Sequence, residues 1–433
     1  MQEIDKFKIT SLGQRKTKSP LKLSGSGQKG YGQFVPDKMS VRYKVEVMPG
    51  IPVEDDFLFE KAGPREELFF DPKDAKVAIV TCGGLCPGLN NVIRSATLEL
   101  FHNYGVKQIF GIRYGFQGLN PEVGKPVVPL TPEFVESIHE DGGSVLGTSR
   151  GPQPIPVMVD FLEKNKINIL VCIGGDGTHR AAHLIYNESL ERGYQLAVVG
   201  IPKTIDNDIM YVSRTFGLST AIQKASEIID CAHSEAHGAI NGIGIVKVMG
   251  RDAGFIAAGA TLASQEVNFT LVPEVPFSIA GFLEALQKRI EQREHAVIAV
   301  AEGAGQNLFK DLPSEKDASG NIKYHDIGIY LKDCINLYFK ERKIPVNIRY
   351  FDPSYFIRSS LPNCDDAILC DQLARNAVHA VMAGKTDVMI GYWNSAFTHV
   401  PISMAIEKKK TISPESELWL SVLAATGQPM DLS

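Results

Sequence analysis

Two apolar runs, each followed at once by a cluster of polar residues, constrain the fold of this chain more than any other feature. The first run, residues 169–173, leads into GGDGT at 174–178, and the second, residues 196–201, leads into PKTIDND at 202–208. Short apolar runs that end in this way are typical of buried strands, and the amphipathic segment between them is expected to be a helix. Ligands bind beyond the carboxyl ends of the strands in open parallel sheets. The pattern therefore predicts an α/β fold that carries two polar clusters at strand ends where ligands bind.

The residue types in these clusters suit the transfer of a phosphoryl group. Glycines let the backbone approach a ligand closely, and the N–H groups that open a helix favour an anion such as phosphate. Asp176 could hold Mg²⁺, a cation that prefers carboxylate, water and phosphate oxygens. Asp206 and Asp208 fall in one tight turn, where one could accept a proton from a substrate hydroxyl while the other holds the metal or orients its partner. Together these features predict phosphoryl transfer to an alcohol.

Length and composition narrow the class of protein. The chain has 433 residues, enough for two domains or more, and its contents of 44% hydrophobic and 22% charged residues are ordinary for a globular protein. The net charge of −5 argues against a general nucleic-acid or membrane binder. The sequence has no apolar run long enough to span a bilayer, and its first residues do not begin a signal peptide. Seven scattered cysteines are expected to be small buried hydrophobes in a reducing compartment. We therefore expect a cytoplasmic protein with neither a nucleic-acid nor a membrane partner.

Strands and helices alternate over about 320 residues, which favours parallel sheets wrapped by helices. The strand predicted at 77–82 leads into a glycine turn at 83–88, which is either a second phosphate cradle or a turn made for packing only. Arg150 closes a glycine-rich loop at 142–151, where its guanidinium could bind phosphate in a bidentate way or remain a surface charge. A further strand at 242–248 leads into MGRDAG at 249–254. Strand ends with polar turns thus recur along the chain.

Other segments carry simpler expectations. Residues 346–358 are predicted to be mostly extended, and Lys408 to Lys410 are predicted to form a solvated face. Residues 16–31, rich in Lys, Ser and Gly, are predicted to form a mobile arm. Residues 49–70 are expected to pack against the core or against a partner subunit.

The motifs GGDGT, PKTIDND, VMGRDAG at 248–254 and YFIR at 355–358 together resemble the phosphofructokinase family, over a range from about residue 77 to residue 393. GGDGT alone also occurs in NAD kinases and lipid kinases, whereas TIDND followed by MGR is highly specific. The resemblance implies an α/β fold of two Rossmann-like domains with mainly parallel sheets wrapped by helices. The expected parts are an N-terminal extension (1–75), a phosphate-donor domain (76–215 with 359–395), a sugar-phosphate domain (216–358) and a C-terminal tail (396–433).

The resemblance also implies the reaction. It is the transfer of the γ-phosphoryl group of ATP to the 1-hydroxyl of fructose 6-phosphate, with Mg²⁺ held by Asp176 and with Asp206 as the general base. The catalytic residues implied are Asp206, Thr204, Arg251 and Asp208. The residues implied to hold the donor are Gly84, Arg150, Gly151, Gly175, Asp176, Gly177, Thr178 and Lys203. Those implied to contact the sugar phosphate are Thr204, Ile205, Asp206, Met249, Gly250, Arg251, Glu302, Arg349, Tyr355, Phe356, Ile357 and Arg358. Arg349 and Arg358 are expected to grip the 6-phosphate, and the protein is expected to be a homo-oligomer, either a dimer or a tetramer.

The phosphoryl donor is the open question within this family. Gly177 resembles the ATP users, because pyrophosphate users usually carry Asp at this position, while Lys203 resembles the pyrophosphate users. Gly177 together with Lys203 also resembles the plant and trypanosomatid ATP-dependent group, so ATP is favoured and pyrophosphate is the alternative. A non-catalytic regulatory subunit is disfavoured, because Asp176, Thr204, Asp206 and Arg251 are all present. Gly242 and Tyr355 stand where bacterial members have arginine and histidine, so bacterial allosteric behaviour is not expected to carry over.

Overall fold

The computed structural model describes residues 6–25, 32–46, 48, 57–313, 315–316 and 322–432. The chain forms two compact units. Unit 1 comprises Met1–Thr204, Ile209–Phe216 and Leu361–Lys409, and unit 2 comprises Ile205–Asp208, Gly217–Ser360 and Lys410–Ser433. Among the described residues, no helix is long and apolar enough to cross a membrane.

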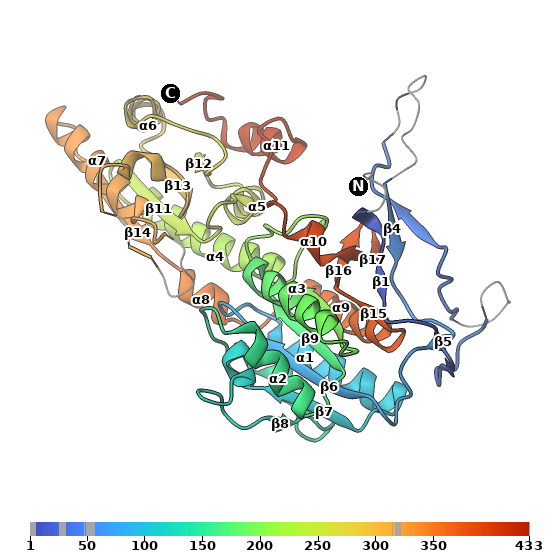
Figure 1. Ribbon diagram of the computed structural model, residues 1–433. Coiled ribbons are helices and arrows are strands. Elements are labelled where there is room, and N and C mark those ends of the chain that lie inside the picture. The colour runs from blue at the N-terminus through green and yellow to red at the C-terminus, as the bar shows by residue number, and fades with distance from the viewer. Residues whose placement is uncertain are drawn as a thin grey trace. The chain divides into compact units, whose positions relative to one another are not determined.

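Unit 1 contains a nine-stranded sheet in the order β3-β4-β17-β16-β10-β9-β6-β7-β8 (Figure 1). The strands from β16 to β7 in this order run parallel, and β3, β4, β17 and β8 pair antiparallel at the two sides. The bounds are β3 (Ser40–Arg42), β4 (Leu58–Lys61), β6 (Lys76–Thr81), β7 (Gln108–Ile112), β8 (Val128–Pro129), β9 (Ile169–Gly174), β10 (Ala197–Pro202), β16 (Val388–Trp393) and β17 (Ala396–Pro401). The strands expected from the apolar runs at 169–173 and 196–201 are thereby confirmed.

Helices cover both faces of this sheet. Every residue of β9 and β10 is therefore buried, whichever face of the sheet it points to. Leu170 and Cys172 pack in one core with Met158 and Ile185, while α1 packs against α9. The helices of unit 1 are α1 (Leu89–Leu98), which continues as the π-helix η2 (Glu99–Tyr104), α2 (Ile155–Lys164), α3 (Asp176–Glu191), α9 (Cys364–Met382) and α10 (Ile402–Ala405), with the short 3-10 helices η3 (Gly115–Leu119) and η4 (Ile138–Glu140).

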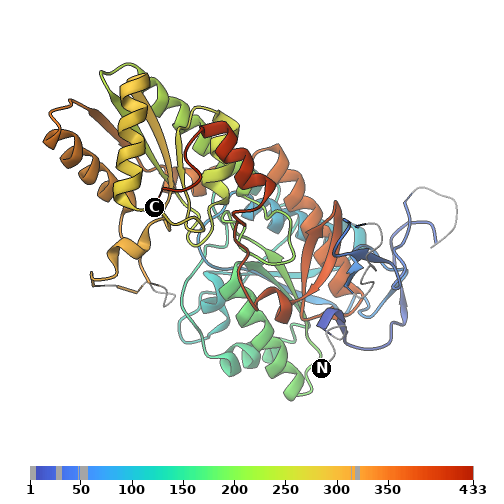
Figure 2. The same ribbon diagram turned by 90° about the horizontal axis from the view of Figure 1, so that it is seen from above.

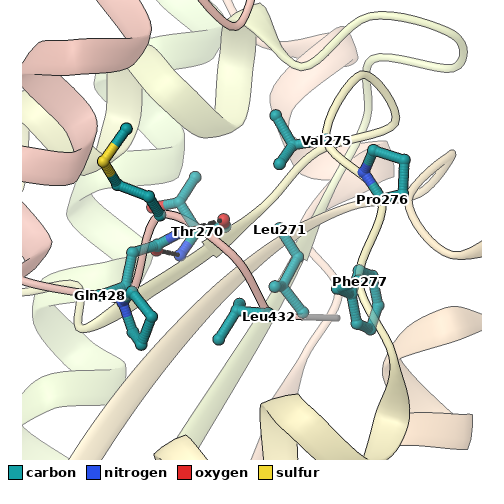
Figure 3. Close-up of a pocket in the computed structure, with 9 residues that line it drawn as sticks. Thr270, Leu271, Val275, Pro276, Phe277, Gln428 and Leu432 are labelled. Atoms are coloured by element: carbon teal, nitrogen blue, oxygen red, sulfur yellow. Dashed lines mark hydrogen bonds between the residues drawn. The ribbon is translucent and has the colours of Figure 1, made fainter.

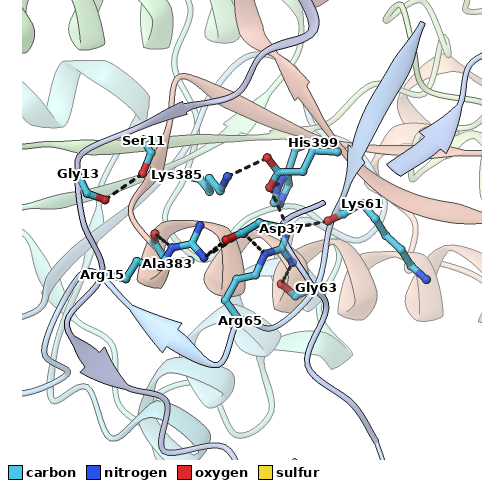
Figure 4. A network of polar contacts seen from close by, with 11 residues as sticks. Ser11, Gly13, Arg15, Asp37, Lys61, Gly63, Arg65, Ala383, Lys385 and His399 are labelled. Atoms are coloured by element: carbon cyan, nitrogen blue, oxygen red, sulfur yellow. Dashed lines mark hydrogen bonds and ion pairs between the residues drawn. The ribbon is translucent and has the colours of Figure 1, made fainter. Parts of the chain in front are cut away.

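The N-terminal segment is attached to unit 1 by short strands and by a charged network. Strand β1 (Thr10–Ser11) pairs with β15 (Lys385–Thr386), and β2 (Thr17–Lys18) pairs with β5 (Glu67–Leu68). The mobile arm predicted for 16–31 is therefore wrong for Thr17–Lys18, and its residues 26–31 lie outside the described residues. In the network, Glu60 accepts hydrogen bonds from Arg65 (2.9 Å), Lys385 (2.8 Å) and His399 (3.0 Å), as Figure 4 shows in part. Within the described residues, the segment predicted to pack at 49–70 thus contacts the core.

Unit 2 is built on a parallel four-stranded sheet in the order β12-β13-β11-β14. Its strands are β11 (Gly242–Val248), β12 (Phe269–Leu271), β13 (His295–Ala301) and β14 (Asn347–Phe351). Its helices are α4 (Leu218–His237), α5 (Phe255–Ser264), α6 (Ile279–Arg293), α7 (Ile327–Glu341), α8 (Ser354–Ser359) and α11 (Glu417–Thr426), with η5 (Gln306–Phe309). Two packed α/β units with mainly parallel sheets confirm the expected fold class.

The two faces of the unit 2 sheet are covered by different helices (Figures 1 and 2). Ile243 and Ile245 pack in a core with α6 and α7. The alternate residues Gly242 and Gly244 face α4, so closely that a Cβ on Gly244 would lie 2.9 Å from the carbonyl oxygen of Ala232. The glycines therefore let α4 lie directly against the sheet.

Two local predictions were wrong. Residues 346–358 are extended only to Phe351, because Pro353 ends the strand and the Asp352 carboxylate accepts the N–H of Ser354 at 3.1 Å, which begins α8. Lys410 does not belong to a solvated face, because it is only partly exposed and its ammonium lies 5.2 Å from the centroid of the Phe255 ring.

The end of the tail forms a small pocket with the edge strand of unit 2 (Figure 3). The side-chain amide of Gln428 accepts the N–H of Thr270 at 2.6 Å and donates to its carbonyl at 3.3 Å, so it continues the hydrogen bonding of β12. The other lining residues are mostly apolar. None of the predicted site residues lines this pocket.

Candidate active site

The register of β9 and β10 brings the GGDGT and PKTIDND motifs side by side. Pro202 pairs with Gly174, the last residues of the two strands, and the N–H of Lys203 donates to the carbonyl of Gly174 at 2.9 Å. GGDGT and PKTIDND therefore leave the sheet of unit 1 at the same edge. This is the edge at which parallel sheets bind ligands.

Lys203 and Arg150 both lie against the glycine turn that follows β6. The Lys203 ammonium donates to the carbonyl of Gly84 at 2.7 Å, and a Cβ on Gly84 would lie 3.3 Å from a guanidinium nitrogen of Arg150. Gly83 in the same turn has φ 86°, a conformation that favours glycine. Two cations thus flank a turn that a side chain would narrow, which suits an anionic ligand.

The GGDGT motif begins α3. Gly174 must be glycine, because a Cβ there would lie 2.1 Å from the Thr178 hydroxyl, and Thr178 is itself buried. Gly177 has open space instead, with no heavy atom within 4 Å of a Cβ placed on it. Gly175 is the N-cap, so the N–H groups of the first turn of α3 open beside Gly177. The loop that carries Arg150 ends at Gly151, which has φ 98°.

Asp176 is the residue of this cluster that fits a magnesium ion. One of its carboxylate oxygens accepts a 2.9 Å hydrogen bond from the Arg180 guanidinium, with which it forms an ion pair. The side chain of Asp176 is partly exposed. Within the described residues, no three His, Cys, Asp or Glu side chains converge as a metal cage. A single carboxylate is nevertheless consistent with Mg²⁺, which usually keeps several waters and is shared with substrate phosphates.

The turn with the two carboxylates is tightly held. Asn207, between Asp206 and Asp208, has φ 56°, a left-handed conformation that asparagine tolerates better than most residues. In unit 1, the carbonyl of Thr204 accepts a 2.6 Å hydrogen bond from the hydroxyl of the buried Thr215. In unit 2, the carbonyl of Asp208 accepts the N–H of Lys410 at 2.9 Å. One carboxylate oxygen of Asp206 is buried, and Ile205 is also buried.

In unit 2, the turn after β11 meets the end of β13. Arg251 has φ 46°, and its N–H donates to the Glu302 carboxylate at 3.2 Å. Burial raises the pKa of Glu302, against the opposing effects of this hydrogen bond and of nearby cations. Gly303 must be glycine, because a Cβ there would lie 1.7 Å from the carbonyl oxygen of Arg251. Met249 and Gly250 precede Arg251 in this turn, and Gly250 has φ 136°.

The two arginines expected to grip the 6-phosphate lie on a strand and on a helix. Arg349 is on β14, where it bonds Asn347 at 2.6 Å and forms a 3.5 Å ion pair with Glu235. Arg358 is on α8, with its guanidinium 4.6 Å from the centroid of the Tyr355 ring. Tyr355 and Phe356 are exposed, whereas Ile357 is fully buried, so the side chain of Ile357 is not available to a ligand.

The structure also explains one departure from the bacterial pattern. A Cβ on Gly242 would lie 2.0 Å from the carbonyl oxygen of Ala236, so this position cannot carry a side chain while α4 is packed as it is. An arginine is therefore excluded here for a steric reason.

Three charged residues near the turn after β11 were missed from the sequence. Lys247 forms ion pairs with Asp326 (2.7 Å) and Asp352 (2.9 Å), and its charge lowers the pKa of Glu302. A lysine in the otherwise apolar strand GIGIVKV, just before the MGR turn, was the available signal. Asp326 and Asp352 are far from it in sequence and gave none.

The comparisons with known proteins agree with this arrangement. The phosphofructokinase family matches residues 76–381. An ATP-dependent 6-phosphofructokinase of Borreliella burgdorferi is 47% identical over 437 residues, which cover 98% of this chain and 97% of that protein. Another, from Entamoeba histolytica, is 50% identical over 367 residues, 84% of each chain. The chain therefore belongs to the phosphofructokinase family.

Solved structures show the same fold. The crystal structure of a pyrophosphate-dependent phosphofructokinase from Marinobacter aquaeolei superposes with a TM-score of 0.67 at 17% identity, covering 83% of this chain and 92% of that one. At this level of identity the likeness concerns the fold and not the choice of donor.

Proposed function

We propose that this chain is an ATP-dependent 6-phosphofructokinase, which converts fructose 6-phosphate and ATP to fructose 1,6-bisphosphate and ADP. The observation that carries the proposal is the pairing of Pro202 with Gly174, which puts the GGDGT and PKTIDND motifs at one sheet edge. The relatives named above are ATP-dependent 6-phosphofructokinases, and each of them aligns with most of this chain.

The donor phosphates are assigned to unit 1. Gly84, Gly151, Gly175 and Gly177 allow the close approach of phosphate, the N–H groups of Asp176 and Gly177 open α3 just before Thr178, and Arg150 and Lys203 supply charge. Mg²⁺ is the proposed cofactor and Asp176 the residue that would hold it. When bound, it neutralises charge on the donor phosphates.

The sugar phosphate is assigned to unit 2 and to the residue that leads into it, Thr204. Asp206 accepts the proton of the 1-hydroxyl as that oxygen attacks the γ-phosphorus, and Asp208, Thr204 and Arg251 support this step. Met249, Gly250 and Glu302 bind the sugar. Arg349, Arg358 and the exposed Tyr355 and Phe356 bind the 6-phosphate end, which helps to orient the 1-hydroxyl. Ile205 and Ile357 contribute through their main chain, because their side chains are buried.

Pyrophosphate is the second candidate donor. Lys203 resembles the pyrophosphate users, yet its ammonium already has a contact with Gly84 that does not depend on the donor. The open space at Gly177 leaves room for the rest of a nucleotide, so ATP is preferred.

The test is the formation of fructose 1,6-bisphosphate by the full chain from fructose 6-phosphate and Mg²⁺, with ATP and pyrophosphate supplied in parallel. Product with ATP alone supports the proposal, and product with pyrophosphate alone transfers it to the second candidate. The absence of product with both donors would favour a non-catalytic subunit. A cytoplasmic location and a homo-oligomeric state, dimer or tetramer, belong to the same proposal and are tested by fractionation and by sedimentation.

A further inference from the structure

The chain segment Lys410–Ile412, here called the tail strap, is bonded to two turns of unit 2. The N–H of Lys410 donates to the carbonyl of Asp208 at 2.9 Å, and the N–H of Ile412 donates to the Glu274 carboxylate at 2.9 Å. The same carboxylate accepts the N–H of Gly254, the last residue of the MGRDAG turn, at 3.0 and 3.1 Å. The tail strap thereby links the turn that contains Asp206 to the turn that contains Arg251.

The side chain of Lys410 follows its main chain into the same region. Its ammonium lies 5.2 Å from the centroid of the Phe255 ring, the first residue of α5, where a cation–π attraction is favourable. Burial lowers the pKa of Lys410 to about 7, and the negative charge of Asp208 opposes this shift. Lys408, two residues earlier in the same tail, is exposed. A lysine side chain is seldom withdrawn from water unless a carboxylate compensates its positive charge.

We propose that Lys410 is a positioning residue for the turn that contains Asp206 and Asp208, acting through Asp208 on the orientation of the Asp206 carboxylate. This inference rests on the proposed function, because it assigns Lys410 to the step in which Asp206 accepts a proton. The hydrogen bond from the N–H of Lys410 to the carbonyl of Asp208 fixes the position of the turn. The positive charge of the Lys410 side chain interacts favourably with the negative charge of Asp208. A general base acts only within hydrogen-bond reach of its proton, so a turn displaced by about 1 Å can cost about a hundredfold in rate.

The experiment compares the wild-type chain with three variants in the presence of Mg²⁺ and fructose 6-phosphate, with ATP as the donor and with pyrophosphate in a parallel assay of the wild type. Lys410→Met removes the charge and keeps most of the length, Lys410→Arg keeps the charge, and Lys408→Met is the matched control on the exposed lysine. The measured quantities are kcat, the KM for each substrate and the thermal midpoint of unfolding. We expect Lys410→Met to lower kcat by about tenfold or more, with the KM for ATP changed by less than about threefold. Lys410→Arg should recover a large part of kcat, and Lys408→Met should match the wild type.

The outcomes separate this proposal from the proposed function. A wild-type chain that is inactive with both donors would overturn both. An active wild type with Lys410→Met and Lys408→Met equal in kcat would overturn the positioning role alone. So would a Lys410→Arg variant as slow as Lys410→Met, because the charge would then have no part. If Lys410→Met does not fold by circular dichroism, Lys410→Gln replaces it under the same expectations, and Lys410→Arg must still be faster than the uncharged variant.

Discussion

The Lys203 ammonium donates a 2.7 Å hydrogen bond to the carbonyl oxygen of Gly84. Within unit 1, this bond joins the start of the PKTIDND motif to the glycine turn after β6, which is far from it in sequence. Lys203 is buried, so the contact is shielded from water. A lysine at this position therefore has a structural reason to be present whichever phosphoryl donor is used.

Replacing Lys203 with Met should destabilise unit 1 and weaken donor binding together. The part-buried carbonyl of Gly84 loses its donor, at a cost of up to about 1–3 kcal/mol, and one positive charge disappears beside the proposed donor phosphates. Urea denaturation measures the first effect and the KM for ATP the second. Lys164→Met, on an exposed position at the end of α2, is the control and should change neither. An unchanged KM for ATP would exclude Lys203 from the donor site.

Replacing Asp206 with Ala should lower kcat by about two orders of magnitude or more, because the proton of the attacking hydroxyl loses its acceptor. Binding of fructose 6-phosphate, measured by calorimetry, should remain largely intact. Asp206→Asn keeps the size of the side chain and should be nearly as slow. Turnover close to that of the wild type in either variant would remove Asp206 from the role of general base.

Replacing Gly177 with Asp should impair the use of ATP more than any use of pyrophosphate. The side chain fits the protein, because a Cβ at this position has no neighbour within 4 Å, so the effect should come from the ligand and not from misfolding. Gly177→Ala adds bulk without charge and should have the smaller effect. The ratio of kcat/KM for the two donors is the measurement, and equal losses with both would mean that Gly177 does not select the donor.

Replacing Glu60 with Gln should destabilise unit 1 at neutral pH by up to about 3 kcal/mol, because Lys385 loses a mostly buried carboxylate partner, while Arg65 retains its ion pair with Asp37. Burial raises the pKa of Glu60, but its hydrogen bonds to His399 and Lys385 and the charges of these residues lower the pKa by a larger amount. The net pKa is well below the usual value. The stability that Glu60 contributes is thus present above about pH 4.3, the unfolded value, and is lost as the pH falls towards the folded value.

Thermal unfolding between about pH 7 and pH 3 tests this dependence. The wild type should lose stability on acidification more steeply than Glu60→Gln. Glu67→Gln, on an exposed residue of β5, is the control. Parallel pH profiles for the wild type and Glu60→Gln would contradict the prediction.

The sequence predicted the elements whose signals are local. The run at 169–173 and the strand β9 agree to within one residue, and so do the segment 280–293 and α6, because unbroken apolar runs and helical periodicity are visible in a short window. Helix α8 was missed because it is only one and a half turns long and depends on the bond between Asp352 and Ser354. For the site, the motif residues could be named, but the burial of Ile357 and the position of Lys410 could not.

The remaining features depend on partners that are distant in the chain. Strands β3 and β4 are short, mixed in composition and recognisable only through their pairing with each other and with β17. The Glu60 network joins an N-terminal residue to His399 near the other end of the chain. Nothing in the immediate sequence of either residue indicates that they meet.

The interleaving of the two units also affects how the protein is made. The chain passes from one unit to the other at five points, and β10, which leads into the turn that contains Asp206 and Asp208, pairs with β16 from the late part of the chain. A nascent chain on the ribosome can complete β6, β9 and β10 early, but the edge of β10 stays uncovered until β16 has been synthesised. Domains otherwise tend to fold in order of synthesis. The complete native sheet therefore cannot form before residue 393 has been synthesised, and any pause in translation before residue 388 would prolong the exposure of an apolar strand edge.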